Sequence, residues 1–405
     1  VAGVEPLKDI AVNVNRHLQS EDGSMLLFIR SGIWKPHGDL YLRNEHDLMS
    51  FEGFQHGTHL ELNTYDAERG LQAEPIISMT GEISNRPHST AADIVSLQMR
   101  KTPFSVFKAY WQAIRLLNQY KPDVVHSHMV HANIFARLLR LLVSFPKLIC
   151  SAHSVNEGRG WRILAYRLTE RLCDLNTNVS QEAVEAFIKQ GAVSAGRMKV
   201  MYNGIDTERF YFNATVRNKL RSQLGIDDNN ILLISVGRLT AAKDYTNLLV
   251  AFAMLSSRSN NVKLVIIGEG EQKEYLTTIA SAQGISERVH FLGLRYDVED
   301  WMSAADIFVL SSAWEGFGLV VAEAMASERV VVATDCGGVR EVVGSAGLLV
   351  PSKNSQQLFT AIEQAMMLSP LEREVMTREA RIRVISHYSI ETICLRWLNL
   401  YQDYT

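Results

Sequence analysis

Short apolar runs alternate with helix-forming segments along most of this chain, and this alternation limits the possible folds more than any other feature. The runs show little polar alternation, which is typical of parallel strands that are covered by helices on both faces. In the second half the predicted strands are 231–236, 263–267, 289–292, 307–311, 330–333 and 347–350. The pattern predicts an α/β fold with doubly wound parallel sheets.

The first half of the chain shows the same rhythm. Its predicted strands are 123–128, 148–153, 176–179 and 199–202, and its clearest predicted helices are 104–119 and 181–190. Residues 33–100 carry only a weak alternation and are predicted to form short strands and loops. A chain of 405 residues is long for one core, so we expect two domains, with the polar, strand-poor segment 206–229 as the candidate link.

Composition excludes several classes of protein. A hydrophobic content of 47%, a charged content of 21% and a net charge of −3 are typical of a soluble globular protein and not of a nucleic-acid binder, which would be strongly basic. The four cysteines are scattered without metal-ligand spacing, so we expect reduced thiols in the cytoplasm. We find neither a signal peptide nor an apolar run close to the roughly 20 residues that span a bilayer.

Two carboxylates eight positions apart surround a glycine-containing turn in the second half. Glu315 follows a predicted buried strand, and Glu323 lies in the helix that comes next. Gly316 and Gly318 would let the backbone approach a ligand closely, and the helix start offers N–H groups to phosphate or hydroxyl oxygens. The pattern favours a site for a polar, anionic ligand. A helix with a charged first turn and a solvent-facing glutamate is the structural alternative.

Two cations follow the first strand of the second half. The strand ends at Gly237, and Arg238 and Lys243 belong to the loop and helix start that come after it. A guanidinium fork and an ammonium group at the carboxyl edge of a parallel sheet suit a diphosphate. Taken alone, either residue is more often a solvated surface charge, and the paired glutamates downstream reverse this balance in favour of a diphosphate site.

In this combination and order, the motifs resemble those of glycosyltransferase family 4, the retaining nucleotide-sugar glycosyltransferases also described as glycosyl transferases group 1. The motifs are Gly237-Arg238-Leu239 with Lys243, Gly268-Glu269-Gly270, Phe291-Leu292-Gly293, Glu315-Gly316-Phe317-Gly318 with Glu323, and Gly337-Gly338-Val339-Arg340-Glu341. In the first half, Pro122 to His128 and Asn203-Gly204-Ile205-Asp206 also match. The resemblance covers about residues 104–404.

The resemblance implies the GT-B architecture, in which two Rossmann-like domains face each other across a cleft. The expected acceptor-binding domain is 1–205, joined by a C-terminal helix that crosses back within 386–405. The expected nucleotide-sugar-binding domain is 206–385. Two departures stand out. No strand precedes the loop around Gly3, which leaves a truncated start and a natural one both open, and the segment 33–102 matches no family pattern.

Residue by residue, the resemblance implies a donor site in the second domain. Glu323 would bind the ribose hydroxyls, while Arg238 and Lys243 would neutralise the diphosphate and stabilise it as a leaving group. Glu315 would hold the donor sugar and distal phosphate. The backbone groups expected to assist it belong to Phe317, Gly318 and Leu319.

The resemblance also implies contacts with the base, the phosphates and the sugar. The backbone at Leu294 and Arg295 would meet the base, Gly3 would approach the phosphates, and His128 would reach the sugar and stabilise charge there. His126 is predicted to be a packed strand residue. His153 is interpreted either as a sugar contact or as part of a structural turn.

Cofactor motifs are weak. Gly268-Glu269-Gly270 lacks the third glycine of a dinucleotide fingerprint and the acidic residue on the next strand, so NAD binding is not expected. No His/Asp cluster has metal spacing, and metal-independent chemistry without a cofactor is expected, with Arg238 and Lys243 in place of a divalent ion.

The stretch 159–167 combines cations with aromatic rings. Such a composition suits anionic headgroups, so a peripheral contact with the cytoplasmic face of the inner membrane is one interpretation. An ordinary domain helix with solvated cations is the other.

The sequence therefore predicts a retaining glycosyltransferase that moves a sugar from a nucleotide sugar, a UDP-sugar, to a glycan or lipid-linked glycan. The expected setting is bacterial surface polysaccharide or lipopolysaccharide biosynthesis. Three alternatives stay open: a nucleotide-sugar epimerase, a phosphorylase of the same architecture, and an inactive nucleotide-sugar-binding subunit.

Overall fold

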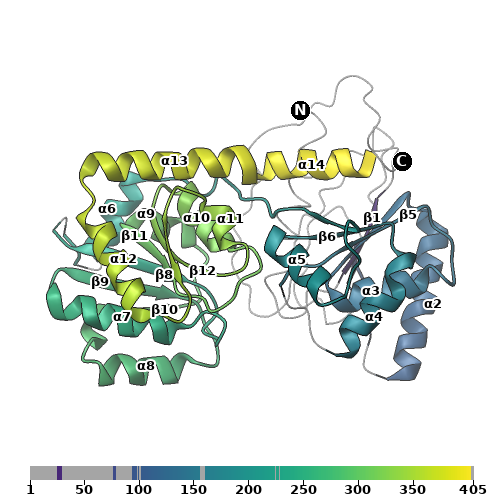
Figure 1. The fold of residues 1–405 in the computed structure, drawn as a ribbon, viewed down its shortest axis with the longest axis horizontal. Helices are drawn as coiled ribbons and strands as arrows, with labels where there is room; N and C mark the ends of the chain where they lie inside the picture. The colour runs from purple at the N-terminus through teal and green to yellow at the C-terminus, as the bar shows by residue number, and fades with distance from the viewer. Residues whose placement is uncertain are drawn as a thin grey trace. The chain divides into compact units, whose positions relative to one another are not determined.

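The chain divides into two compact units (Figure 1). The computed structural model describes residues 25–29, 76–78, 94–97, 99, 102–155, 160–223, 225–227 and 229–402. The first unit comprises Val1–Gly204 and Ile390–Thr405, and the second comprises Ile205–Ser389. The segment 206–229, expected to be a link, belongs to the second unit from its first residue.

The first unit contains a seven-stranded sheet with the order β3-β2-β1-β4-β5-β6-β7. Strands β4 to β7 are parallel, as the apolar runs predict. β1, which the sequence pattern did not reveal, runs antiparallel to both β2 and β4, so this sheet is mixed and not parallel throughout. The strands are β1 Met25–Ile29, β2 Ile76–Ser78, β3 Ile94–Ser96, β4 Val124–His128, β5 Lys147–Ser151, β6 Leu175–Asn178 and β7 Met198–Val200.

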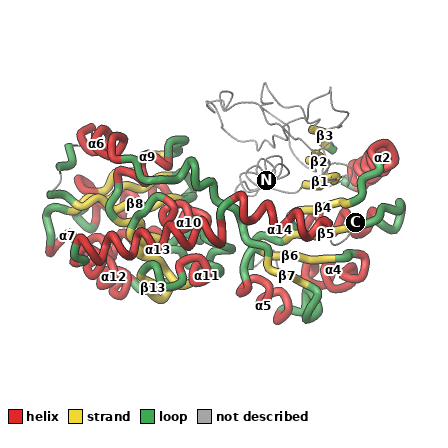
Figure 2. Tube along the Cα trace, turned by 90° about the horizontal axis from the view of Figure 1, so that it is seen from above, coloured by secondary structure: helices red, strands yellow, loops and turns green. Residues whose placement is uncertain are grey.

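Helices cover both faces of this sheet. On one face, α2 buries Ala109, Ala113 and Leu117 in a core that it shares with α3 and the strands β4 and β5. On the other face, α14 packs Cys394 and Leu400 into a core with the strands β4, β5 and β6 (Figure 2). The predicted return of the last helix to the first domain is confirmed. The helices of this unit are α2 Pro103–Tyr120, α3 Val130–Leu139, α4 Trp161–Thr169, α5 Gln181–Lys189 and α14 Ile390–Gln402, with a 3₁₀ turn at Glu170–Leu172.

The second unit is a doubly wound α/β unit around a six-stranded sheet with the order β10-β9-β8-β11-β12-β13. All of its strand pairs are parallel. The strands are β8 Ile231–Val236, β9 Val262–Ile267, β10 Val289–Gly293, β11 Ile307–Leu310, β12 Val330–Asp335 and β13 Leu348–Pro351. In the central strands β8, β9, β11 and β12 nearly all apolar side chains are buried between the helices, which explains why continuous Val, Ile and Leu runs identified them.

The helices of the second unit complete this arrangement. They are α6 Ala214–Gln223, α7 Tyr245–Arg258, α8 Lys273–Ala282, α9 Val298–Ala304, α10 Leu319–Ala326, α11 Val339–Val343, α12 Ser355–Met367 and α13 Pro370–Tyr388, with a 3₁₀ turn at Ser286–Arg288. The strand order reverses direction between β8 and β11. In such sheets ligands bind outside the carboxyl ends of the strands at this switch point, because the loops there diverge to opposite faces. The loops after β8 and β11 are therefore the first place to look for a site.

Candidate functional site

The loop after β8 is shaped by a glycine. Gly237 has a φ of 156°, and a Cβ added to it would lie 2.8 Å from Cε of Lys243. The side chain of Lys243 therefore passes directly over the backbone of Gly237. The buried hydroxyl of Tyr245 fixes this turn by donating a hydrogen bond to the Gly237 carbonyl at 3.1 Å. A side chain at position 237 would displace the lysine.

Lys243 and Glu315 form an ion pair between the two loops. The distance from Nζ of Lys243 to Oε1 of Glu315 is 2.6 Å, and the side chains are 19% and 14% exposed. The hydroxyl of Ser312 donates to the same Oε1 at 2.7 Å. The backbones of the two loops are also joined, because the amide of Ala313 donates to the carbonyl of Ala242 at 2.8 Å. Two of the predicted site residues, 72 positions apart, are thus held in contact.

Arg238 lies on the same loop as Lys243 and is exposed. Lys243, by contrast, is half-buried and held by Glu315. The loop after β8 therefore carries two positive charges that differ in burial.

The loop after β11 leads into α10 through two close backbone contacts. Gly318 is the N-cap of α10 with a left-handed φ of 90°, and an added Cβ would lie 3.1 Å from Cγ2 of Val339. At Gly337, an added Cβ would lie 1.9 Å from the carbonyl oxygen of Glu315, so only glycine fits there. The start of α10, at Leu319, directs its first amide groups toward the carboxyl edge of the sheet, where they suit an anion.

The side chain of Phe317 is buried and supports the turn before α10. Its side chain is 3% exposed, and its ring meets that of Tyr388 edge-on with centroids 5.5 Å apart. Only its backbone can therefore serve a ligand, which agrees with the role expected for it. The buried ring anchors the turn that presents Gly318 and Leu319.

Glu323 lies in α10 and is half-buried. Its neighbourhood includes Arg209, a residue that the sequence did not single out. Burial lowers the pKa of Arg209, but the hydrogen bond and charge of Glu299 and the charge of Glu323 outweigh it and raise that pKa. Arg209 donates to Oε2 of Glu299 at 2.7 Å and to the carbonyl of Tyr296 at 2.8 Å. Arg209 is therefore bound to Tyr296 in the loop that follows β10 and to Glu299, and it lies within the electrostatic reach of Glu323.

That loop carries the two residues expected at the base. Leu294 is half-exposed. The guanidinium group of Arg295 binds the carboxylate of Asp297 in a bidentate manner, with distances of 2.8 and 2.6 Å. Burial raises the pKa of Asp297, but the bond and charge of Arg295 dominate and lower it. The side chain of Arg295 is thus engaged with Asp297, and the expected contact of its backbone with the base stays a prediction.

Three histidines of the first unit, His126, His128 and His153, form a separate group on β4 and just after β5. His128 is 2% exposed, and its Nδ1 lies 3.0 Å from Nε2 of His153. His126 is 1% exposed, with Nδ1 2.8 Å from the hydroxyl of Tyr401 and Nε2 2.7 Å from that of Ser151. The prediction that His126 is packed in the core is confirmed. Gly3 and the turn 156–158 lie outside the described residues.

His126 leads to a prediction on acid stability. Burial first, and then the charge of His153, lower its pKa to about 3. In the unfolded chain a histidine titrates near 6.5, so between these values the unfolded state binds more protons. The free energy of unfolding should therefore fall as the pH drops below about 6.5, by about 2 kcal/mol at pH 5.

Urea unfolding at several pH values measures this effect. In His126→Gln, which keeps an amide that can bond to Tyr401 and Ser151, the free energy of unfolding should change less between pH 7 and pH 5. Equal pH dependence in the two proteins would show that His126 is not the titrating group.

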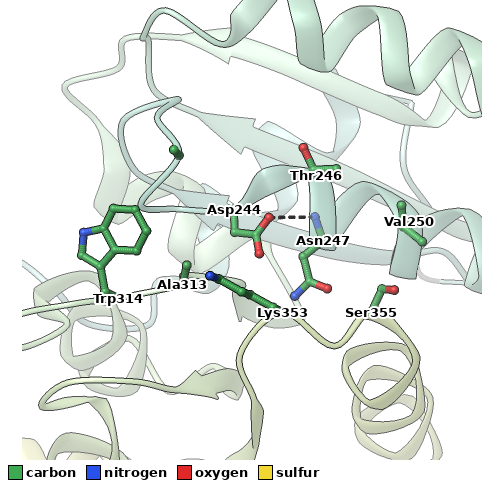
Figure 3. A pocket seen from close by; sticks show the side chains of 9 residues that line it. Asp244, Thr246, Asn247, Val250, Ala313, Trp314, Lys353 and Ser355 are labelled. Atoms are coloured by element: carbon green, nitrogen blue, oxygen red, sulfur yellow. Dashed lines mark hydrogen bonds between the residues drawn. The ribbon is translucent and has the colours of Figure 1, made fainter.

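A pocket of about 490 Å³ lies at the start of α7 (Figure 3), and residues adjacent in sequence to the Lys243–Glu315 pair line it. Asp244 and Trp314, the sequence neighbours of the pair, belong to its lining, together with Asn247, Lys353 and Ser355. Asp244 caps α7 by accepting a hydrogen bond from the amide of Asn247. The pocket therefore adjoins the pair from the side of α7 and α12, and its walls do not include the pair itself.

Within the described ranges, no three His, Cys, Asp or Glu side chains gather in a group that could hold a metal ion. None of the helices that the structure describes is long and apolar enough to cross a membrane.

Two family models match the chain one after the other. The model described as Glycosyltransferase Family 4 matches residues 64–209, and the one described as Glycosyl transferases group 1 matches residues 216–383. The second match contains every predicted site residue of the second unit.

Relatives and solved structures agree with these matches. An uncharacterised glycosyltransferase of Methanocaldococcus jannaschii is 28% identical over 303 residues, 71% of this chain and 77% of that protein. The UDP-Gal:alpha-D-GlcNAc-diphosphoundecaprenol alpha-1,3-galactosyltransferase of Escherichia coli is 26% identical, with 71% and 77% covered. The Anabaena protein HepE, solved with UDP and glucose, has a TM-score of 0.68 at 24% identity and covers 77% of this chain and 86% of its own, a likeness of fold.

Proposed function

The chain belongs to the family 4 glycosyltransferases, and from this premise we propose that it transfers a sugar from a UDP-sugar to a lipid-linked glycan with retention of anomeric configuration. The observation that carries the proposal is the Lys243–Glu315 pair at the switch point of the second sheet, with Arg238 on the same loop and Glu323 one helix further on. The sheet edge there provides cations for a diphosphate and carboxylates for hydroxyl groups.

In this proposal the second unit, Ile205–Ser389, binds the donor and the first unit binds the acceptor. Arg238 and Lys243 contact the diphosphate. Glu315 and the amides at the start of α10 hold the donor sugar and distal phosphate, and Glu323 accepts hydrogen bonds from the ribose diol. The backbone at Leu294 and Arg295 meets the base, while His128 and Gly3 act from the first unit.

The proposed reaction is a same-face substitution at the anomeric carbon. The bond between this carbon and the diphosphate oxygen breaks, and the acceptor oxygen forms the new bond on the same face. The proton of the acceptor hydroxyl passes to the departing diphosphate. Lys243, positioned by Glu315 at 2.6 Å, stabilises the negative charge that develops on the leaving group, and Arg238 adds to it. Their charges stand where a divalent ion would otherwise act.

The acceptor class is supported by the named relatives. The E. coli enzyme and a Campylobacter jejuni N-acetylgalactosaminyltransferase, 28% identical over 56% of this chain and 60% of its own length, both have diphospho-undecaprenol in their names. The name of the E. coli enzyme also gives a UDP-sugar as donor. These names support a lipid-linked acceptor, bacterial surface polysaccharide or lipopolysaccharide biosynthesis, and a cytoplasmic location at the membrane face.

The three alternatives differ in what they consume. An epimerase converts the nucleotide sugar with no acceptor, and a phosphorylase uses free phosphate as acceptor. A binding subunit retains UDP affinity without releasing UDP from any donor. Measuring UDP release with acceptor, with phosphate and with neither therefore distinguishes them, and the proposal expects release with a glycan acceptor.

The role of Glu323 yields a prediction on nucleotide affinity. If its carboxylate binds the ribose diol, the wild-type protein should bind UDP about tenfold to a hundredfold more tightly than 2′-deoxy-UDP, because a hydrogen bond to a charged group is lost. In Glu323→Ala the two ligands should bind almost equally. Isothermal titration calorimetry measures the four dissociation constants.

The control for this comparison of UDP with 2′-deoxy-UDP is Glu374→Ala, which removes an exposed glutamate from α13. It should keep the wild-type preference for UDP. A Glu323→Ala variant that still prefers UDP over 2′-deoxy-UDP as strongly as the wild type would remove Glu323 from the ribose site.

A further inference from the structure

Two helices of the first unit expose apolar stripes with the same spacing. The stripe on α2 consists of Phe104, Phe107 and Trp111, and that on α4 consists of Trp161, Leu164 and Leu168. All six side chains are at least 54% exposed, and Phe104 reaches 79%. Both stripes follow the spacing i, i+3, i+7, which places each set on one side of its helix. Aromatic and aliphatic surface gathered in this way marks an interaction site in a water-soluble unit.

The core does not need these side chains. α2 packs on its sheet through Ala109, Ala113 and Leu117, and α4 through Tyr166, which is 1% exposed. The exposed stripes lie on other sides of the same helices. Each helix is therefore apolar on two sides, and the second side requires a function other than folding.

Within α2, α3 and α4 the charged side chains have one sign. α2, α3 and α4 contain no Asp or Glu, whereas Lys108 and Arg115 on α2 are exposed. The guanidinium group of Arg115 lies 4.9 Å from the ring centroid of Trp111, so cation and aromatic ring share one surface. On α4, Arg162 and Arg167 accompany the stripe. We name the surface of α2 and α4 formed by these ten residues the basic-aromatic face.

A helix of the second unit shows that this pattern is not a general property of the chain. α13 also exposes apolar side chains, namely Leu371, Val375 and Ile382. It contains Glu372, Glu374 and Glu379 among its arginines, so its charges are mixed. Exposed apolar surface with cations and no acids is thus specific to α2 and α4 in this comparison.

The topology places the start of both helices at one edge of the sheet. α2 connects β3 to β4 and α4 connects β5 to β6, and in each case the two strands point the same way. A helix that joins parallel strands runs back along them, so Phe104 and Trp161 lie toward the carboxyl edge. His128, which ends β4, lies at the same edge. The basic-aromatic face therefore begins at the edge where the proposed acceptor site is located.

We infer that the basic-aromatic face docks on the surface of a bilayer that contains anionic phospholipid. Phe, Trp and Leu side chains enter the boundary between headgroups and acyl chains, while Lys108, Arg115, Arg162 and Arg167 pair with lipid phosphates. Charge complementarity selects this partner, since three helices without a carboxylate meet a negative surface. The inference rests on the proposed function in one respect. Docking would bring the carboxyl edge of the first sheet, where His128 lies, to an acceptor substrate that is embedded in the membrane. It also extends the expected membrane segment, 159–167, to α2.

Sedimentation with sucrose-loaded vesicles tests this docking on the full chain. One vesicle type is phosphatidylcholine alone, and the other is phosphatidylcholine with phosphatidylglycerol. The wild-type protein should bind the anionic vesicles and lose this binding at high salt. Phe104→Ser/Phe107→Ser/Trp111→Ser should reduce the partition coefficient about tenfold or more. Lys108→Gln/Arg115→Gln should reduce it about thirtyfold.

The matched control replaces the stripe of α13 in Leu371→Ser/Val375→Ser/Ile382→Ser, which should bind anionic vesicles like the wild type. Circular dichroism and urea unfolding verify that all variants are folded, which is expected because every substituted residue is exposed. Transfer to a water-soluble acceptor should survive in the α2 variants. Vesicle binding without any sugar transfer would overturn the proposed function and leave the docking intact.

Three results would overturn the docking. The first is equal binding of the wild type to neutral and anionic vesicles. The second is undiminished vesicle binding by both α2 variants. The third is a change from dimer to monomer in the aromatic variant, seen by sedimentation velocity, with no vesicle binding by the wild type, because the face would then join two copies of the chain.

Discussion

Lys243→Met is expected to lower kcat/KM for sugar transfer by about 10² to 10³, the loss typical of removing one group that stabilises developing charge. Methionine keeps an unbranched chain to pass over Gly237 but has no positive charge. The ammonium lies 2.6 Å from Oε1 of Glu315 and is 19% exposed, so a diphosphate that reaches it is only partly screened by water. Steady-state kinetics of UDP release measure the loss.

The control for this variant is Lys273→Met, which removes an exposed lysine at the start of α8. Its kcat/KM should stay within about twofold of the wild type, because a solvated charge contributes little. A Lys243→Met variant that retains wild-type kcat/KM would show that the lysine only pairs with Glu315. Unfolding measurements separate the catalytic loss from any loss of folded protein.

Asp306→Asn is expected to lower the free energy of unfolding by about 3 to 5 kcal/mol, because two arginines would lose their buried partner. Oδ1 of Asp306 accepts from Arg217 at 2.6 Å, and Oδ2 accepts from Arg221 at 3.0 Å and from the amide of Leu232 at 2.8 Å. The Asp306 side chain is 12% exposed and that of Arg221 only 3%. Urea unfolding measures the change.

Asp306 also makes the free energy of unfolding depend on pH. Burial raises its pKa, but the charge of Arg217, the Leu232 amide and the charge of Arg221 outweigh burial and lower it. The stability that it contributes is therefore complete above its unfolded pKa, near 3.9, and is lost as the pH falls through its lower folded pKa.

A matched control is Asp335→Asn, which breaks a pair with Arg340 whose side chain is 69% exposed. A pair of this kind contributes at most about 1 kcal/mol, so the variant should unfold almost like the wild type. Equal losses in Asp306→Asn and Asp335→Asn would contradict the stabilising role given to the buried pairs of Asp306 with Arg217 and Arg221.

The sheet of the second unit was largely predictable from sequence. Residues 231–236 were predicted as a strand and form β8, Ile231–Val236, and 330–333 lies within β12. Buried parallel strands need apolar side chains on both faces, so they stand out as continuous runs. The strand β1, Met25–Ile29, was not predicted at all. Its antiparallel direction could not have been predicted either, since an apolar run specifies a strand and not which way it pairs.

The candidate site was predictable in its parts and not in its contacts. Lys243 and Glu315 were both selected because each follows a strand at the carboxyl edge, but their ion pair depends on how two loops meet. Arg209 was missed because its segment is polar and strand-poor, and its relation to Glu323 exists only in space. The exposed stripe of α2 was missed as well, since a helical pattern does not reveal which apolar sides are covered.

Transfer of a labelled sugar into a lipid-extractable product tests most directly whether the chain moves a sugar from a nucleotide to an acceptor. A panel of UDP-sugars is supplied with a bacterial lipid extract, and the product is followed for the wild type, Lys243→Met and Lys273→Met. The account predicts a labelled lipid product from at least one donor, formed only with the extract, nearly absent with Lys243→Met and unchanged with Lys273→Met. A product that forms equally well with Lys243→Met, or conversion of the donor without any acceptor, would contradict it.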